Sequence, residues 1–176
     1  MPAPRHVWRH VIVNTKGSWL HGDQRGFRSR DHRIHSSGDY KHPPPAGEHA
    51  ALHRHEKRNC PKPVDFSHNL RERIVVAFRD TLREQGFRVL VVSCSETHLH
   101  ALAELPRSRS ETKGIVGEAK RIASRSVKRE MPGSVWSAGG TFKPCNSRSH
   151  QRRAFKYIRD RQEEGAFVWH FRMGKA

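Results

Sequence analysis

Short runs of apolar and β-branched residues recur along the chain and predict five strands. The first run is His6–Asn14, which is followed by the turn-like sequence Thr15-Lys16-Gly17. The second and third runs are separated only by Ser95-Glu96, which predicts an antiparallel pair. The four later predicted strands are residues 87–95, 97–105, 134–145 and 166–172.

Apolar residues at spacings of three and four predict three helices between these strands. Ser67 is suited to cap the first, and Gly86 to end it. A second helix opens at Ser110 and closes at Met131-Pro132-Gly133. The third, residues 147–165, has a serine start and a glycine stop. The buried stripe of the first helix is Leu70, Ile74, Ala77, Phe78 and Leu82.

The predicted order is β-α-β-β-α-β followed by α-β, which indicates an α+β fold of the ferredoxin-like, split βαβ type. Such a fold is an antiparallel sheet with helices packed on it. RRM-type nucleic-acid binders share the order, so the fold alone leaves the function open. Residues 1–176 are expected to form one domain. Residues 17–63 lack apolar periodicity and predict a long irregular insertion.

Positive charge dominates the composition. The 176 residues include 34 Lys and Arg against 17 Asp and Glu, a formal net charge of +17. This balance favours a polyanionic partner, and nucleic acid above others. No apolar run reaches the roughly 18 residues that cross a bilayer, so no membrane association is expected and the protein is placed in the cytoplasm. The three cysteines are widely spaced, which indicates reduced thiols rather than a disulfide framework.

Basic residues are expected to bind the phosphate backbone on two surfaces, because Lys and Arg contact phosphate without reading sequence. One surface is a face of the second helix and the other is the start of the third. Trp19 lies in a glycine-rich, charged segment and is a candidate for stacking on an unpaired base. The basic candidates are Lys113, Lys120, Arg121, Arg125, Lys128, Arg152 and Arg153.

His98 and His100 are the first candidates for chemistry. The side-chain period of a strand is two, so both point to one face while Leu99 points to the other. Two imidazoles on a rigid strand make half of a metal site. The spacing proves nothing by itself, because 14 histidines in 176 residues give about one His-x-His by chance. The alternative interpretation is a pair of partly exposed strand histidines that contact nucleic acid.

Tyr157 lies near the middle of the last predicted helix, where a tyrosine can also simply anchor an apolar face. Together with the strand histidines it resembles the single-tyrosine HUH transposases, including the REP-associated tyrosine transposases. His98-Leu99-His100 matches the His-hydrophobic-His element of that family, and Tyr157 matches its nucleophile. Two further stretches resemble the family in the same order: "GSWLHGDQRGF", residues 17–27, and "SVWSAGGTFKP", residues 134–144.

The resemblance implies one HUH-type domain that nicks single-stranded or hairpin DNA and transfers the strand. The tyrosine would attack a phosphate, form a 5′-phosphotyrosine link and free a 3′-hydroxyl. A divalent metal, Mg²⁺ or Mn²⁺, held by His98 and His100, would neutralise charge at the scissile phosphate. Imidazole ligands by themselves suit Mn²⁺, Zn²⁺ or Ni²⁺ better than Mg²⁺. Relatives are monomers or homodimers, and a prokaryotic protein of this kind would associate with the nucleoid.

The sequence departs from the family at the third metal ligand, usually Gln or Asn one helical turn past the tyrosine. Arg161 stands there, and a guanidinium cannot ligate a metal. Arg161 could touch the scissile phosphate instead. On a regular helix Asp160 and Glu164 share the face of the tyrosine, whereas Gln162 becomes a candidate only if the helix frays. The third ligand is therefore left open among Asp160, Glu164 and Gln162.

A second hypothesis is a non-catalytic, RRM-like nucleic-acid binder or a domesticated transposase relative that binds DNA without cutting it. In that case His98 and His100 would contact nucleic acid, or form a structural zinc site completed by Cys94.

Overall fold

A five-stranded antiparallel sheet forms the centre of the computed structural model, which describes residues 2–24, 37–38, 42, 44–60 and 62–173. The order across the sheet is β4-β1-β3-β2-β5. The first four strands have the order of a ferredoxin-like fold, which confirms the predicted α+β class, and β5 extends the sheet beside β2. The strands are β1 (His6–Asn14), β2 (Val89–Cys94), β3 (His98–Pro106), β4 (Thr141–Pro144) and β5 (Phe167–His170).

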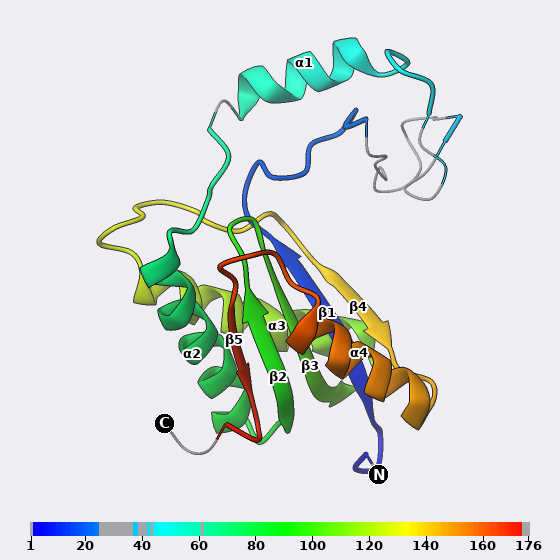
Figure 1. Cartoon of the computed structure of the whole chain (residues 1–176), viewed down its shortest axis with the longest axis vertical. Helices are drawn as coiled ribbons and strands as arrows, with labels where there is room; N and C mark the ends of the chain where they lie inside the picture. Colours follow the sequence, from blue (N-terminus) through cyan, green and yellow to red (C-terminus); the bar gives the residue numbers. More distant parts are fainter. Residues whose placement is uncertain (1, 25–36, 39–41, 43, 61, 174–176) are drawn as a thin grey trace.

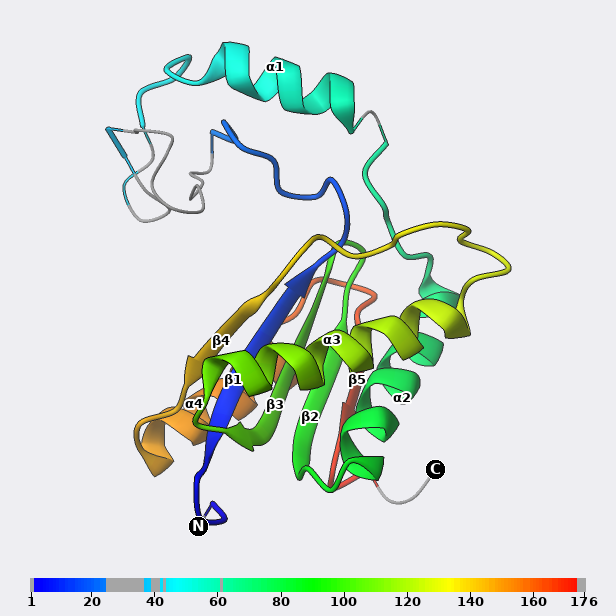
Figure 2. The same ribbon diagram turned by 180° about the vertical axis from the view of Figure 1, so that it is seen from behind.

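Helices cover both faces of the sheet. α2 and α3 lie side by side on one face, and α4 lies alone on the other (Figures 1 and 2). In both views α1 lies beyond the end of the sheet, away from these layers. Across the described residues, no helix is long and apolar enough to span a membrane. The helices are α1 (Ala50–Asn59), α2 (His68–Glu84), α3 (Arg109–Ser126) and α4 (Arg148–Asp160).

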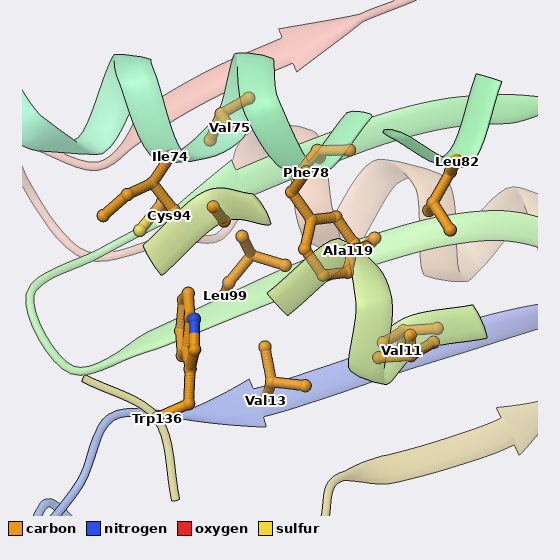
Figure 3. Close-up of a cluster of buried hydrophobic side chains, with 14 of the residues drawn as sticks. Val11, Val13, Ile74, Val75, Phe78, Leu82, Cys94, Leu99, Ala119 and Trp136 are labelled. Atoms are coloured by element: carbon orange, nitrogen blue, oxygen red, sulfur yellow. The ribbon is translucent and has the colours of Figure 1, made fainter. Parts of the chain in front are cut away.

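The larger hydrophobic core lies between the sheet and the α2-α3 layer (Figure 3). Val11 of β1 and Leu99 of β3 point into it from the sheet, and both are fully buried. Ile74 and Phe78 of α2 meet them, as the spacing of four along the sequence predicts. This burial of apolar side chains is the main term that stabilises the fold.

A smaller core lies beneath α4 on the opposite face. Leu102 of β3 and Val91 of β2 are fully buried there, together with Ala154 and Ile158 of α4. Because side chains alternate along β3, Leu102 shares its face with His98 and His100. The α4 core therefore fixes which face of the sheet carries the histidines.

The structure differs from the predicted elements before α2 and again before β4. α1 lies inside the segment predicted to be irregular. It has no apolar periodicity that would predict a helix, because none of its residues is buried. The predicted strand 134–145 is reduced to β4, Thr141–Pro144, since Trp136 turns into the core instead of continuing the strand. The indole nitrogen of Trp136 donates to the carbonyl oxygen of Lys120, at 3.0 Å.

The last helix is also shorter than predicted, because α4 ends at Asp160 rather than near Gly165. The backbone N–H of Arg161 and the side-chain amide of Gln162 both donate to the carbonyl oxygen of Tyr157, each at 3.0 Å. Gly165 then takes a positive φ of 76°, and its carbonyl oxygen accepts a hydrogen bond of 2.6 Å from buried Arg71. This turn returns the chain to the sheet as β5.

Candidate active site

Three histidines from two neighbouring strands meet on the α4 face of the sheet. β1 and β3 pair with Ile12 opposite His100, so His10 lies diagonally across from His100 on the same face. The Nε2 atom of His10 is 2.8 Å from the Nδ1 atom of His100. The ring centroids of His98 and His100 are 4.8 Å apart, with the rings nearly perpendicular.

Tyr157 is presented to this cluster by α4. Its ring centroid is 5.7 Å from that of His100, in a perpendicular arrangement, and 5.9 Å from that of His10. Ala154 and Ile158, on the same helix, are buried against the sheet and hold α4 in place. Tyr157 itself is 46% exposed, so its hydroxyl group is accessible to a substrate in solution. The structure thus brings together the three residues that the sequence singled out, His98, His100 and Tyr157.

Burial keeps the three imidazoles neutral at physiological pH. It lowers the pKa of His10 to about 4 and that of His100 to about 3, and nearby positive charge adds to the effect. Lys143, the cross-strand partner of His10, contributes to both shifts. Burial also lowers the pKa of His98, while the charge of Glu163 opposes that shift. A neutral imidazole has the lone pair that a metal ion or a proton requires.

Hydroxyl groups orient the outermost imidazole of the cluster. The Oγ of Ser95 lies 3.0 Å from the Nδ1 of His98, and the Oγ1 of Thr97 lies 3.2 Å from the same atom. Ser95 is nearly fully buried at the turn between β2 and β3. A metal-ligating histidine is commonly held in this way through its other ring nitrogen.

The donor set fits a divalent ion held by two protein ligands, His98 and His100. Within the described ranges, no group of three or more His, Cys, Asp or Glu side chains is arranged to hold a metal ion. The Nε2 of His10 is engaged with the Nδ1 of His100, so this nitrogen is not available as a third ligand. An ion at the two imidazoles would therefore complete its coordination with oxygen atoms of substrate phosphate and water, as Mg²⁺ and Mn²⁺ do.

The predicted third-ligand candidates either bond to other groups or lie beyond the end of α4. The carboxylate of Asp160 bonds to the neighbouring Arg159, at 2.6 and 2.8 Å. Gln162 donates to the carbonyl oxygen of Tyr157, and Glu164 lies exposed beyond the end of α4. Arg161 is the exposed C-cap residue of α4. α4 ends at Asp160, so the placement of Glu164 on the face of Tyr157 by regular helix geometry was wrong. Gln162 lies past the end of the helix, which is the condition under which it was a candidate, and the third ligand stays a prediction.

Glu163 is the carboxylate whose charge acts on the histidine cluster, through His98. No sequence pattern singled out Glu163, nor His10, Lys143 and His150, whose charges or contacts act on the same cluster. From the sequence, His10 could be placed on the same face of the predicted first strand as Ile12, because the two residues are two positions apart. Only the β1-β3 pairing shows that this face is the one that carries His100.

Cys94 does not belong to this cluster, and the zinc alternative that used it was wrong. Its side chain is fully buried in the core between the sheet and α2-α3, close to Ile74 and Leu99 (Figure 3). Burial raises the pKa of the Cys94 thiol well above its ordinary value. Alternation along β2 and β3 places its sulfur on the opposite face from His98 and His100.

The predicted basic surfaces are exposed in part. Lys113 and Arg125 are exposed on α3, Lys128 is exposed just after it, and Arg152 and Arg153 are exposed on α4. Arg121 is exposed as well but pairs with Glu118, at 2.6 Å. Trp19 is 44% exposed, so base stacking by this side chain stays a prediction.

Lys120 differs from the other members of the α3 face because it has a structural role. Its Nζ donates to the carbonyl oxygens of Ser137 and Gly139, at 2.8 and 2.7 Å. The ammonium group is half-buried, and burial lowers its pKa. Lys120 thus stabilises the segment that leads to β4, and its hydrogen bonds are made to this segment and not to phosphate.

Comparison with known proteins gives a match at the level of structure. No protein-family model matches the chain, and no curated protein matches its sequence. A solved REP-associated tyrosine transposase, bound to a REP hairpin, aligns with a TM-score of 0.47 and 11% sequence identity. The alignment covers 90% of this chain and 67% of that chain. A structural similarity at this low sequence identity does not establish an activity, which depends on the side chains of the site.

Proposed function

We propose that this protein is a metal-dependent enzyme that nicks single-stranded DNA and transfers the strand, with Tyr157 as its nucleophile. The observation that carries the proposal is the position of the Tyr157 ring, 5.7 Å from His100 and on the same face as His98. An accessible phenol beside two neutral imidazoles suits metal-assisted phosphoryl transfer to tyrosine. The net charge of +17 supports a nucleic-acid substrate.

The chain supplies the nucleophile, the ligands and the positive charge of the reaction. The oxygen of Tyr157 attacks the phosphorus of a phosphodiester, and the bond to the 3′-oxygen breaks. The phenolic proton passes to solvent at the exposed side of the ring, and the leaving 3′-oxygen takes up a proton from solvent. The products are a 5′-phosphotyrosine and a free 3′-hydroxyl group. His98 and His100 would hold a divalent ion, which would supply Lewis-acid stabilisation of the charge that develops on the phosphate. The reverse attack by a 3′-hydroxyl joins the strand and releases Tyr157.

Lys143 and Arg161 flank the proposed reaction centre with positive charge. Lys143 is exposed on β4, and its charge acts on both His10 and His100. Arg161 is exposed four residues after Tyr157. Both side chains can contact phosphates next to the scissile one, where Lys and Arg bind without reading base sequence.

The test is formation of a covalent protein-DNA adduct. Labelled single-stranded DNA with a hairpin, taken from the flanks of the gene, is incubated with the protein and Mn²⁺ or Mg²⁺ and run on a denaturing gel. We expect an adduct with the wild-type protein that is lost in Tyr157→Phe, in His100→Ala and with EDTA. The matched control is Tyr40→Phe, because Tyr40 is the only other tyrosine, and this variant should form the adduct normally.

Two results would overturn the proposal. One is an adduct that forms equally well with Tyr157→Phe. The other is tight DNA binding by the wild-type protein without any adduct across the flanking sequences and both metals. The second result would favour the non-catalytic nucleic-acid binder or an inactive transposase relative.

A further inference from the structure

Two cavities adjoin at the end of the sheet that is remote from the histidine cluster. One is about 530 Å³ and lies between the end of α2, the start of β2 and β5. The other is about 840 Å³ and lies between the N-terminal segment and the start of α4. Trp8 and Arg88 line both, so the two cavities adjoin at these side chains. "Trough" below means these two cavities together.

The trough is strongly positive. Five arginines line it, and no acidic residue occurs among the described residues that form its walls. Asp80 and Glu104 pair with two of the arginines, Arg79 and Arg88. The other three are exposed and take part in none of the ion pairs among the described residues. They are Arg83, Arg107 and Arg148.

Aromatic rings alternate with these guanidinium groups. The Cζ atom of Arg79 lies 4.8 Å from the ring centroid of Trp169, and that of Arg83 lies 6.0 Å from it. Arg88 covers Trp8 in the same way, at 5.4 Å. Phe171 is 50% exposed at the wall of the trough. Flat guanidinium and phenyl surfaces of this kind are platforms on which unpaired bases stack.

We propose that the trough binds a single-stranded segment of the DNA whose phosphate is attacked by Tyr157. Arginines spread over two cavities suit a polyanion with repeated phosphates better than one small anion, and the exposed ring suits its bases. α4 connects the trough with the reaction centre, since Gln151 lines the trough and Tyr157 follows six residues later. At 1.5 Å per residue this separation is about 9 Å along the helix axis. The placement rests on the proposed function of Tyr157.

Binding measurements with Tyr157→Phe separate this proposal from the nicking chemistry, because that variant holds DNA without reacting. Fluorescence anisotropy compares a blunt hairpin with the same hairpin carrying a single-stranded extension of about eight nucleotides. We expect Arg83→Ala combined with Arg148→Ala to weaken binding of the extended hairpin more than that of the blunt one. Loss of two phosphate contacts should reduce the salt slope of log K by about 1.4.

Phe171→Ala tests the stacking part by a different signature. This variant should weaken binding of the extension by about fivefold or more without changing the salt slope, because a ring has no charge to release counterions. The matched control is Arg125→Ala on α3, outside the trough, which should not discriminate between the two DNAs. Thermal unfolding of each variant checks that the fold is retained; the changed side chains are exposed.

The proposal fails if the double arginine variant weakens the blunt and extended hairpins equally. It also fails if polyglutamate displaces the extension as effectively as single-stranded DNA does at equal charge, which would indicate an acidic peptide partner. If the adduct forms at Tyr157 but the trough variants bind DNA normally, the proposal for the trough is refuted and the proposed nicking function is not. If the trough variants weaken binding of the extended hairpin more than that of the blunt one but no adduct forms with the wild-type protein, only the proposed nicking function is refuted.

Discussion

The Nε2 atom of His10 lies 2.8 Å from the Nδ1 atom of His100, across the β1-β3 pair. Both imidazoles are neutral, so one of these nitrogens carries the shared proton. When Nδ1 of His100 donates it, the Nε2 of His100 keeps its lone pair for a metal ion. His10 is then a positioning residue that fixes the ligand tautomer of His100.

Replacing His10 should weaken metal binding without removing a metal ligand. We expect His10→Phe to lower Mn²⁺ affinity by about tenfold or more, the usual effect of losing such a partner. His10→Gln should retain much of the affinity, because the amide oxygen can accept from the Nδ1–H of His100. Titration calorimetry with Mn²⁺ measures both, and His68→Ala, an exposed histidine of α2, is the control. Equal loss in the Phe and Gln variants would contradict the positioning role.

Glu163 and Glu164 should differ although they are neighbours. The charge of Glu163 acts on His98, so Glu163→Gln removes negative charge that favours a cation at the cluster. We expect Mn²⁺ affinity to fall a few-fold in Glu163→Gln, a modest effect because the side chain is exposed and screened. Glu164→Gln should bind Mn²⁺ as the wild-type protein does. The reverse ranking in calorimetry would restore Glu164 as the ligand candidate.

Lys120 should matter for stability more than for DNA binding. Lys120→Met keeps the aliphatic stem but removes the two hydrogen bonds to the carbonyl oxygens of Ser137 and Gly139. Loss of charged hydrogen bonds of this kind predicts a fall in the free energy of unfolding of about 1.5–3 kcal/mol. Lys113→Met, an exposed position on α3, should change it by no more than about 0.5 kcal/mol. Urea denaturation followed by circular dichroism provides the comparison, and equal effects would refute the structural role.

Acid should destabilise the protein through its histidine cluster. The pKa values of His10 and His100 in the folded state, about 4 and about 3, lie below the ordinary value of 6.5. Below pH 6.5 His10 and His100 therefore become protonated in the unfolded chain while they stay neutral in the folded chain. The free energy of unfolding should fall as the pH drops from about 7 to about 4.

The measurement is urea denaturation across this pH range, with a chelator present so that metal release does not contribute. The double variant His10→Gln and His100→Gln lacks both groups and should show a shallower decline than the wild-type protein. Parallel curves would mean that other groups, such as His98 or surface carboxylates, account for the acid sensitivity.

Much of the fold follows from local patterns in the sequence. The positions of α2, α3 and the strands β1 to β3 were predictable because their apolar residues repeat with the period of the element they form. α1 was not predictable in this way, since none of its residues is buried and it has no apolar stripe. The end of α4 at Asp160 was not predicted either, because the glycine that marks a helix stop in the sequence is Gly165.

The sequence by itself determined that His98 and His100 share one face of a strand, because side chains on a strand alternate with a period of two. It also determined the strong positive charge that favours a nucleic-acid partner. Only the tertiary structure decided that α4 covers that same face, which places Tyr157 next to His100 while Cys94 faces the opposite core. Strand pairing likewise decided that His10 contacts His100, because residues 90 positions apart become neighbours only through the register of β1 with β3.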